Sequence, residues 1–170
     1  ATAAGATYND KNVAGANKVS YTGVALGGTG AGNYSIADTA QGKGTITKRA
    51  LTLGTVTAQT KIYDGTTAAD AGKFSAALTN AIAGDSVAAT ATGAAYNDKN
   101  VAGANRIDYT GVGLAGADAG NYTLAATTAQ GAGTIAKRAL TVDTVAAQSK
   151  TYDGNTTADT SKFHATLGNV

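Results

Sequence analysis

The stretch Tyr8-Asn-Asp-Lys-Asn-Val-Ala-Gly-Ala-Asn17 recurs letter for letter at residues 96–105, an offset of 88 positions. Tyr21-Thr-Gly-Val24 returns at residues 109–112 with the same offset. Further along, Lys48-Arg-Ala-Leu51 matches residues 137–140 with an offset of 89. Self-similarity at one period is typical of repeated structural units, so this 170-residue chain spans just under two repeat lengths.

The aromatic residues keep to this period. Aromatic side chains bury the most surface per residue, so in a chain of small residues we expect them to anchor the core of each repeat. The ten aromatic residues form five repeat-equivalent pairs, namely Tyr8/Tyr96, Tyr21/Tyr109, Tyr34/Tyr122, Tyr63/Tyr152 and Phe74/Phe163.

The composition excludes several classes of protein. Ala (39), Thr (28) and Gly (23) fill 90 positions, while Leu, Ile, Val and Phe together number only 26, so each core is expected to be thin. The absence of Cys excludes disulfides and thiolate metal sites, and a single histidine, His164, excludes multi-histidine metal sites. A net charge of +2 without a basic stripe argues against nucleic acid as a partner, and no apolar run is long enough to span a membrane.

Local patterning favours strands. Leu51–Thr57 and Leu140–Val145 alternate apolar and hydroxyl residues, and Val19–Val24 and Asn105–Val112 are similar. Residues 42–49 and 131–138 are further strand candidates, whereas Ala-rich residues 68–82 are the one segment that could be helical. We therefore predict an all-β chain of small tandem modules with five to seven strands each. They are β-sandwich-like, or β-grasp-like with one short helix, and join end to end into an elongated rod.

The repeat allows two divisions of the chain. In the first, residues 50–137 form one complete repeat, preceded by the C-terminal part of another (1–49) and followed by the N-terminal part of a third (138–170). In the second, residues 1–82 and 83–170 are two modules. The sequence does not choose between these phases.

Two motifs carry a family resemblance. Lys137-Arg-Ala-Leu-Thr141, followed by Ser149-Lys-Thr-Tyr-Asp-Gly154, resembles the opening of the YDG and MBG repeats of very large bacterial surface proteins. Tyr96–Val101 with the Gly-Asn-Tyr block at 120–122 resembles their middle and end. The resemblance implies a small β module in the stalk or fibre of a filamentous-haemagglutinin-like adhesin, with no catalysis and a secreted, Gram-negative cell-surface location.

Two kinds of cation or covalent site are conceivable. The aspartate pairs Asp64/Asp70 and Asp153/Asp159 flank short Thr-rich loops and could offer oxygen ligands to calcium, although their spacing matches no known calcium loop. Aspartates that cap their own turns are the favoured alternative, and the Asn-Asp-Lys-Asn loops at 9–12 and 97–100 are expected to form Asx turns. An isopeptide crosslink from Lys61 to Asn33 or Asn121 is a weaker hypothesis. No cofactor other than calcium is indicated.

The functional prediction is therefore a non-catalytic stalk or spacer, a fragment of a tandem array whose partners are neighbouring repeats of the same chain. The alternatives are a module whose exposed tyrosines bind host or matrix glycans, and a self-assembling filament or sheath subunit that contacts like chains. An enzyme is the least supported class, because no nucleophile motif, catalytic base or phosphate loop is present.

Overall fold

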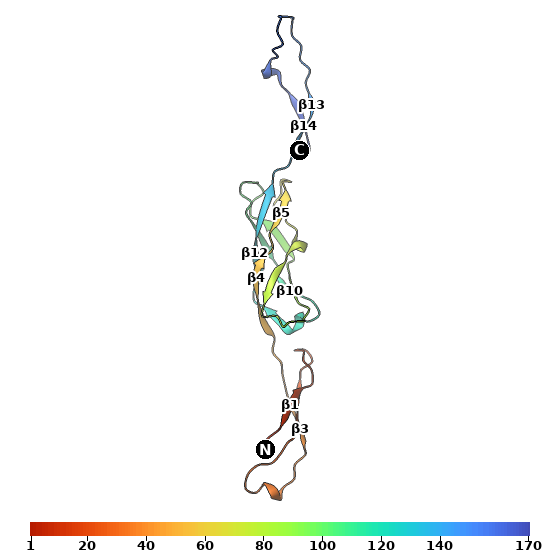
Figure 1. Ribbon diagram of the computed structural model, residues 1–170, viewed down its shortest axis with the longest axis vertical. Helices are drawn as coiled ribbons and strands as arrows, with labels where there is room; N and C mark the ends of the chain where they lie inside the picture. Colours follow the sequence, from red (N-terminus) through yellow and green to blue (C-terminus); the bar gives the residue numbers. More distant parts are fainter.

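The computed structural model describes residues 1–170 and is all-β, with several sheets. Three parts follow one another along its longest axis (Figure 1). They are named here the N-terminal segment (residues 1–48), the central body (residues 49–136) and the C-terminal segment (residues 137–170). The N-terminus lies near one end of the molecule, and the C-terminal segment forms the other end.

The N-terminal segment is a three-stranded antiparallel sheet in the order β1-β2-β3. An isolated bridge between Thr2 and Ala25 extends it. Its elements are β1 (Gly5–Tyr8), β2 (Lys18–Thr22), the three-residue 3-10 turn η1 (Ala31–Asn33) and β3 (Thr39–Lys43). We expected a strand over residues 42–49, but β3 ends at Lys43, residues 44–48 lie outside any strand, and Arg49 already begins β4.

The central body holds nine strands in three sheets, ordered β11-β4-β6, β5-β12-β9-β8 and β10-β7. Its first half contains β4 (Arg49–Val56), β5 (Gln59–Ile62), the 3-10 turn η2 (Ala71–Lys73) and β6 (Ala76–Thr79). Its second half contains β7 (Ala88–Thr90), β8 (Gly93–Tyr96), β9 (Arg106–Thr110), β10 (Gly113–Ala115), the 3-10 turn η3 (Ala119–Asn121), β11 (Tyr122–Leu124) and β12 (Thr128–Ala136).

The two halves of the central body are joined by parallel strand pairs. β4 pairs with β11, and β5 pairs with the second part of β12, in the register Gly133–Ala136 against Gln59–Ile62. Within each half the pairing is antiparallel, as between β4 and β6 or between β9 and its neighbours β8 and β12. Local hairpins thus build each half, and the long-range parallel pairs assemble them.

The core lies between these halves. Phe74 of the first half packs on Tyr109 of the second, with ring centroids 4.7 Å apart and planes inclined by 58°. An offset aromatic contact of this kind contributes about 0.5–1.5 kcal/mol beyond the area it buries. The remaining members of the buried cluster are Ala89, Tyr96, Ala104, Ile107, Val112 and Ile135. Leu53 of β4 and Ala129 of β12 pack against it, so two sheets contribute to one core.

The predicted helix over residues 68–82 is wrong. Asp70 caps the single turn η2, its Oδ1 accepting a hydrogen bond from Gly72 N at 2.9 Å, and β6 follows. Leu78 lies opposite Leu53 of β4 in the antiparallel register, so this residue belongs to a strand of the sheet. Pairing with β4 overrides the modest helix propensity of this Ala-rich stretch, which Gly72 already weakens.

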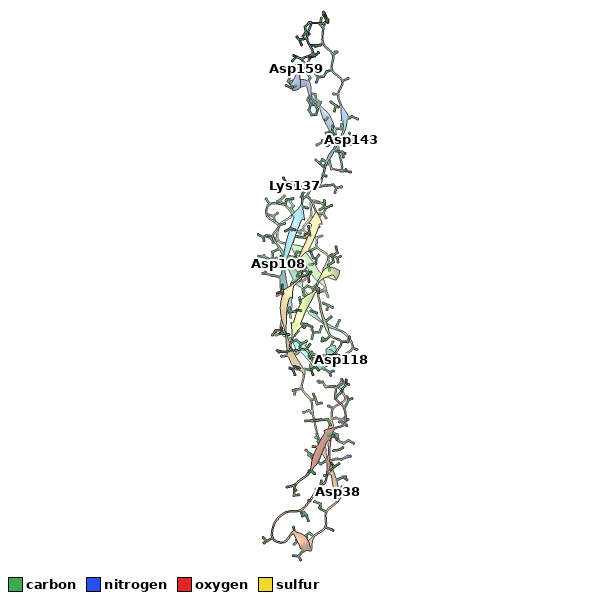
Figure 2. The ribbon with its side chains drawn as sticks, viewed as in Figure 1. Asp38, Asp108, Asp118, Lys137, Asp143 and Asp159 are labelled. Atoms are coloured by element: carbon green, nitrogen blue, oxygen red, sulfur yellow. The ribbon has the colours of Figure 1, made fainter.

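The C-terminal segment is a long hairpin of β13 (Thr141–Val145) and β14 (Ala165–Gly168), with the 3-10 turn η4 (Thr160–Lys162) before β14. It contains no buried residue. Figure 2 shows Lys137 where this hairpin leaves the central body, with Asp143 and Asp159 farther along it.

Candidate functional site

The Tyr-Asp-Gly loop at residues 63–65 encloses a lysine ammonium group. Lys61 Nζ donates to Asp64 Oδ1 at 2.8 Å, to the Thr66 carbonyl at 2.9 Å, to Thr66 Oγ1 at 3.1 Å and to the Ala68 carbonyl at 3.0 Å. It also lies 5.4 Å from the centre of the Tyr96 ring, within the range of a cation–π interaction. The loop therefore wraps around a cation that the chain itself supplies.

The electrostatics of this loop favour the ionised aspartate. The hydrogen bond from Lys61 and those from the backbone and side chain of Thr66 lower the pKa of Asp64 to about 2. Gly65 closes the turn with φ of +79°, a left-handed conformation that any side chain would strain. Lys61, Asp64, Gly65 and Thr66 together thus stabilise the shape of one turn.

The same arrangement recurs in the C-terminal segment. Lys150 Nζ donates to Asp153 Oδ1 at 2.9 Å, to both oxygens of Asn155 at 2.8 and 3.0 Å, and to the Thr157 carbonyl at 3.0 Å. The Lys150 hydrogen bond, followed by that of Asn155 N, lowers the pKa of Asp153. Gly154 has φ of +76°. The loop therefore forms in the exposed C-terminal segment as it does in the central body.

The aspartates proposed as calcium ligands have other partners. Asp64 and Asp153 bind lysines, while Asp70 and Asp159 cap 3-10 turns by accepting from Gly72 N and from Ser161 N and Oγ. The hydrogen bonds of Ser161 lower the pKa of Asp159. No three acidic, His or Cys side chains gather anywhere in the structure. The geometry thus agrees with the turn-capping alternative.

The isopeptide hypothesis also finds no support in the geometry. Lys61 is held by its own loop, whereas Asn121 binds Asn12, as described below. Asn33 has no side-chain hydrogen bond in the structure and lies in the N-terminal segment.

The Asn-Asp-Lys-Asn loops form the expected Asx turns. Asp10 Oδ1 accepts from Asn12 N at 2.8 Å, and Asp98 Oδ1 accepts from Asn100 N at the same distance. The first loop requires glycine at position 15, because a Cβ there would lie only 1.9 Å from Asp10 Oδ2. In both loops the aspartate side chain is thus used within the loop itself.

A junction joins the N-terminal segment to the central body. Asn121 Oδ1 accepts from Val13 N at 2.9 Å, and Asn121 Nδ2 donates to Asn12 Oδ1 at 2.9 Å. Beside it, Tyr122 OH donates to Asp85 Oδ2 at 2.5 Å and accepts from Ile82 N at 3.0 Å. A surface groove at this junction is lined by residues of both parts, among them Val13 and Ile82. Asn121 thus links two parts of the molecule through both atoms of one amide.

The burial of the ten predicted aromatic anchors depends on the part of the molecule in which they lie. In the central body Phe74, Tyr96, Tyr109 and Tyr122 are buried and Tyr63 is half-buried. Elsewhere Tyr21 is half-buried, and the exposed fractions are 50% for Tyr8, 76% for Tyr34, 94% for Tyr152 and 60% for Phe163.

Sequence reasoning missed the lysine-centred loop. The available signal was the matched placement of Lys61 and Lys150, each two residues before Tyr-Asp-Gly. A lysine so close to an aspartate on a tight turn can reach back to its carboxylate and to the turn's carbonyl groups.

These features define an all-β protein whose recurring loops are stabilised by their own side chains. Residues 47–129 match the model of the YDG domain family, which supports a YDG-type module in this part of the chain. The match runs from just before β4 to the beginning of β12 and so includes most of the central body. No curated protein and no solved structure matches the chain. No helix in the structure is long and apolar enough to cross a membrane.

Proposed function

We propose that the chain is a non-catalytic stalk or spacer of a secreted bacterial surface adhesin or extracellular fibre, in which repeats follow one another as a semi-rigid rod. The observation that carries this proposal is the junction at Asn121. The amide bonds both Val13 and Asn12, so it restrains rotation of the N-terminal segment against the central body. A spacer needs such restraint in order to hold a distal part away from a surface.

The covalent connection supports the same function. Only residues 44–48 separate β3 from β4, and they contain no Pro/Ser-rich linker. A short connection beside a bonded junction leaves little freedom between successive parts. The N-terminal segment, central body and C-terminal segment accordingly lie in a line (Figure 1).

The use of polar groups also favours a structural function. Lys61 and Lys150 donate to backbone carbonyl groups of their own loops, and the aspartates of both Asx turns accept from backbone N–H groups of theirs. Side chains used in this way stabilise the turns of the fold. The match to the YDG domain, together with the motifs that resemble adhesin repeats, supports a location at the bacterial cell surface.

Spin-label distances test the rod directly. Because the chain has no Cys, Lys43→Cys on β3 and Lys73→Cys on η2 give one exposed label on each side of the junction. We expect a narrow distance distribution that broadens in Asn121→Ala and stays narrow in the matched control Asn33→Ala. A distribution already broad with Asn121 intact would contradict the stalk.

A further inference from the structure

We propose that the central body resists tension along the chain, because its first and last strands are paired so that they have to slide past each other before the body opens. Tension reaches the body through Lys48, just before β4, and leaves it through Lys137, just after β12. That such tension acts in the cell rests on the proposed stalk function, whereas the resistance follows from strand pairing alone. The rod and this resistance are measured by different experiments, so either proposal can fail alone.

The first and last strands of the body run side by side in the same direction. β11 pairs in parallel with β4, in the register Tyr122–Leu124 against Arg49–Leu51. β12 pairs in parallel with β5, in the register Gly133–Ala136 against Gln59–Ile62. We name these two parallel ladders together the shear clamp. The register shifts by a single residue between the ladders, so β4 and β5 follow β11 and β12 along the body.

The chain enters and leaves the body at opposite ends. In Figure 1 the N-terminal segment lies beyond the end where β4 begins, and β5 and β12 lie together at the other end. Figure 2 shows Lys137 at that second end, toward the C-terminal segment. Tension on the two flanking segments therefore pulls β4 and β12 in opposite directions along the axis that the paired strands share.

This direction of pull decides how the hydrogen bonds are loaded. Hydrogen bonds between strands run across the strand axis, and in parallel pairs they are evenly spaced. When paired strands are pulled past each other along that axis, all the bonds of both ladders are strained together. When paired strands are separated from one end, their bonds break one after another. The shear clamp meets tension in the first way, in which the bonds share the load.

Side chains also oppose sliding in the shear clamp. Thr60 Oγ1 and Thr134 Oγ1 lie 2.9 Å apart on directly opposite residues, so a hydroxyl hydrogen bond joins β5 to β12. Between the two ladders β4 packs closely on β12 at Gly131, where an added Cβ would lie 2.9 Å from Val56 Cγ1. The first and last strands are therefore in contact between the ladders as well as within them.

Burial keeps water away from one face of the shear clamp. Each of its four strands contributes a residue that is at most 9% exposed, namely Leu51, Gln59, Tyr122 and Ile135. Gln59 Nε2 also donates to Tyr109 OH at 2.7 Å, so sliding of β5 breaks a buried hydrogen bond. A hydrogen bond that breaks where water cannot replace it costs more than an exposed one. Burial thus raises the barrier to sliding.

The body also contains a strand pair outside the path of the tension. β7 and β10 pair in antiparallel fashion, with Ala88 directly opposite Ala115. Neither strand adjoins the point where the chain enters the body or the point where it leaves. This pair therefore provides an internal control for the shear clamp.

Single-molecule force spectroscopy on the full chain tests the proposal by changing the direction of pulling. Because the chain has no Cys, handles attach only where Cys is introduced. Lys48→Cys with Lys137→Cys loads the shear clamp along its strands, whereas Ile62→Cys with Lys137→Cys separates β5 from β12 at the end where both strands finish. All three positions are exposed. We expect an unfolding force at least about twofold higher in the first direction. Equal forces in the two directions would overturn the proposal.

The released length identifies the unfolding event. Handles at positions 48 and 137 are 89 residues apart, so complete opening of the body releases up to about 320 Å of chain. We expect the highest force peak to come before this release. Gradual lengthening with no preceding peak would show that the body opens without sliding and would overturn the proposal.

A removable metal crosslink locates the resistance. Thr60→His with Thr134→His places two imidazoles across the shear clamp, at exposed and directly opposite positions. Ni²⁺ at about a hundred times its dissociation constant should slow unfolding between handles 48 and 137 at least about tenfold at constant force, because the strands cannot slide while the metal bridges them. The matched control is Ala88→His with Ala115→His, also exposed and opposite, across β7 and β10. There we expect Ni²⁺ to change the rate by less than about twofold.

Two control measurements accompany this test. Far-UV circular dichroism verifies that each variant keeps its fold, and urea unfolding verifies that Ni²⁺ stabilises both histidine variants. A difference under force then reflects the direction of the load and not equilibrium stability. A crosslink in the shear clamp that leaves the rate unchanged, or a crosslink between β7 and β10 that slows unfolding as much, would overturn the proposal even if the spin-label distances support the rod.

Discussion

Residues 8–48 and 96–136 have closely similar sequences but different structures. Both begin with the same ten residues, and in both the first Asn and Asp make the same hydrogen bonds within the loop. Yet Tyr34 is 76% exposed while its counterpart Tyr122 is 3% exposed. The difference is the partner, because β11 and β12 pair with β4 and β5, and residues 34–36 and 44–47 have no such neighbours. Local sequence thus determines turns and hairpins, whereas burial depends on the complementary half.

The largest expected effect comes from removing the aromatic contact between Phe74 and Tyr109. Phe74→Ala should lower the unfolding free energy of the central body by about 3–5 kcal/mol, because it leaves a cavity beside Tyr109. The matched change Phe163→Ala should cost less than about 0.5 kcal/mol, since Phe163 is exposed. Urea denaturation at a concentration where the chain is monomeric measures both. Equal losses of unfolding free energy would contradict the comparison, because they would show that Phe74 and Phe163 lie in the same environment.

A buried hydrogen bond should give a smaller effect. Gln59→Ala removes the donor to Tyr109 OH and to the Asp70 carbonyl and should cost about 1–3 kcal/mol. The counterpart change Gln148→Ala should lie within about 0.5 kcal/mol of zero in the monomer. Combining Gln59→Ala with Tyr109→Phe isolates the pair. Strictly additive losses would mean that this bond does not join the halves.

The smallest expected effect is the shift in the pKa of Asp64 and of Asp153. The two loops should agree here, because each aspartate accepts a hydrogen bond from the lysine of its own loop. Carboxyl NMR titration should give Asp64 a pKa of about 2 and Asp153 a pKa below the usual value of about 3.9. A lowered folded-state pKa stabilises above the unfolded value, and the contribution disappears as pH falls from about 4 towards 2. Lys61→Met and Lys150→Met should each raise the pKa of the adjacent aspartate. An unshifted Asp153 in the parent chain would mean that its loop needs a partner.

Much of the fold followed from periodicity and much did not. Alternation located β4 at residues 51–57 and β9 at 105–112, within one or two residues, because the Thr-rich pattern of these strands is local. The parallel pairing of β5 with β12 left no local signal, since four residues such as Gln59–Ile62 form a strand only beside their partner. For the same reason Tyr152, whose neighbours match those of Tyr63, was expected in a core and is 94% exposed. The sequence shows a lysine at the same position before both Tyr-Asp-Gly motifs, but the hydrogen bonds from this lysine to the turn were not predicted.

The most direct test of the account is amide hydrogen exchange in the dilute, monomeric chain, comparing residues 134–136 with their counterparts 45–47. We predict that 134–136 exchange slowly, because β5 and β12 pair there. Residues 45–47 should exchange quickly, because they lie outside any strand. Equal protection of both stretches in the dilute monomer would contradict the claim that complementary halves, and not local sequence, build the body.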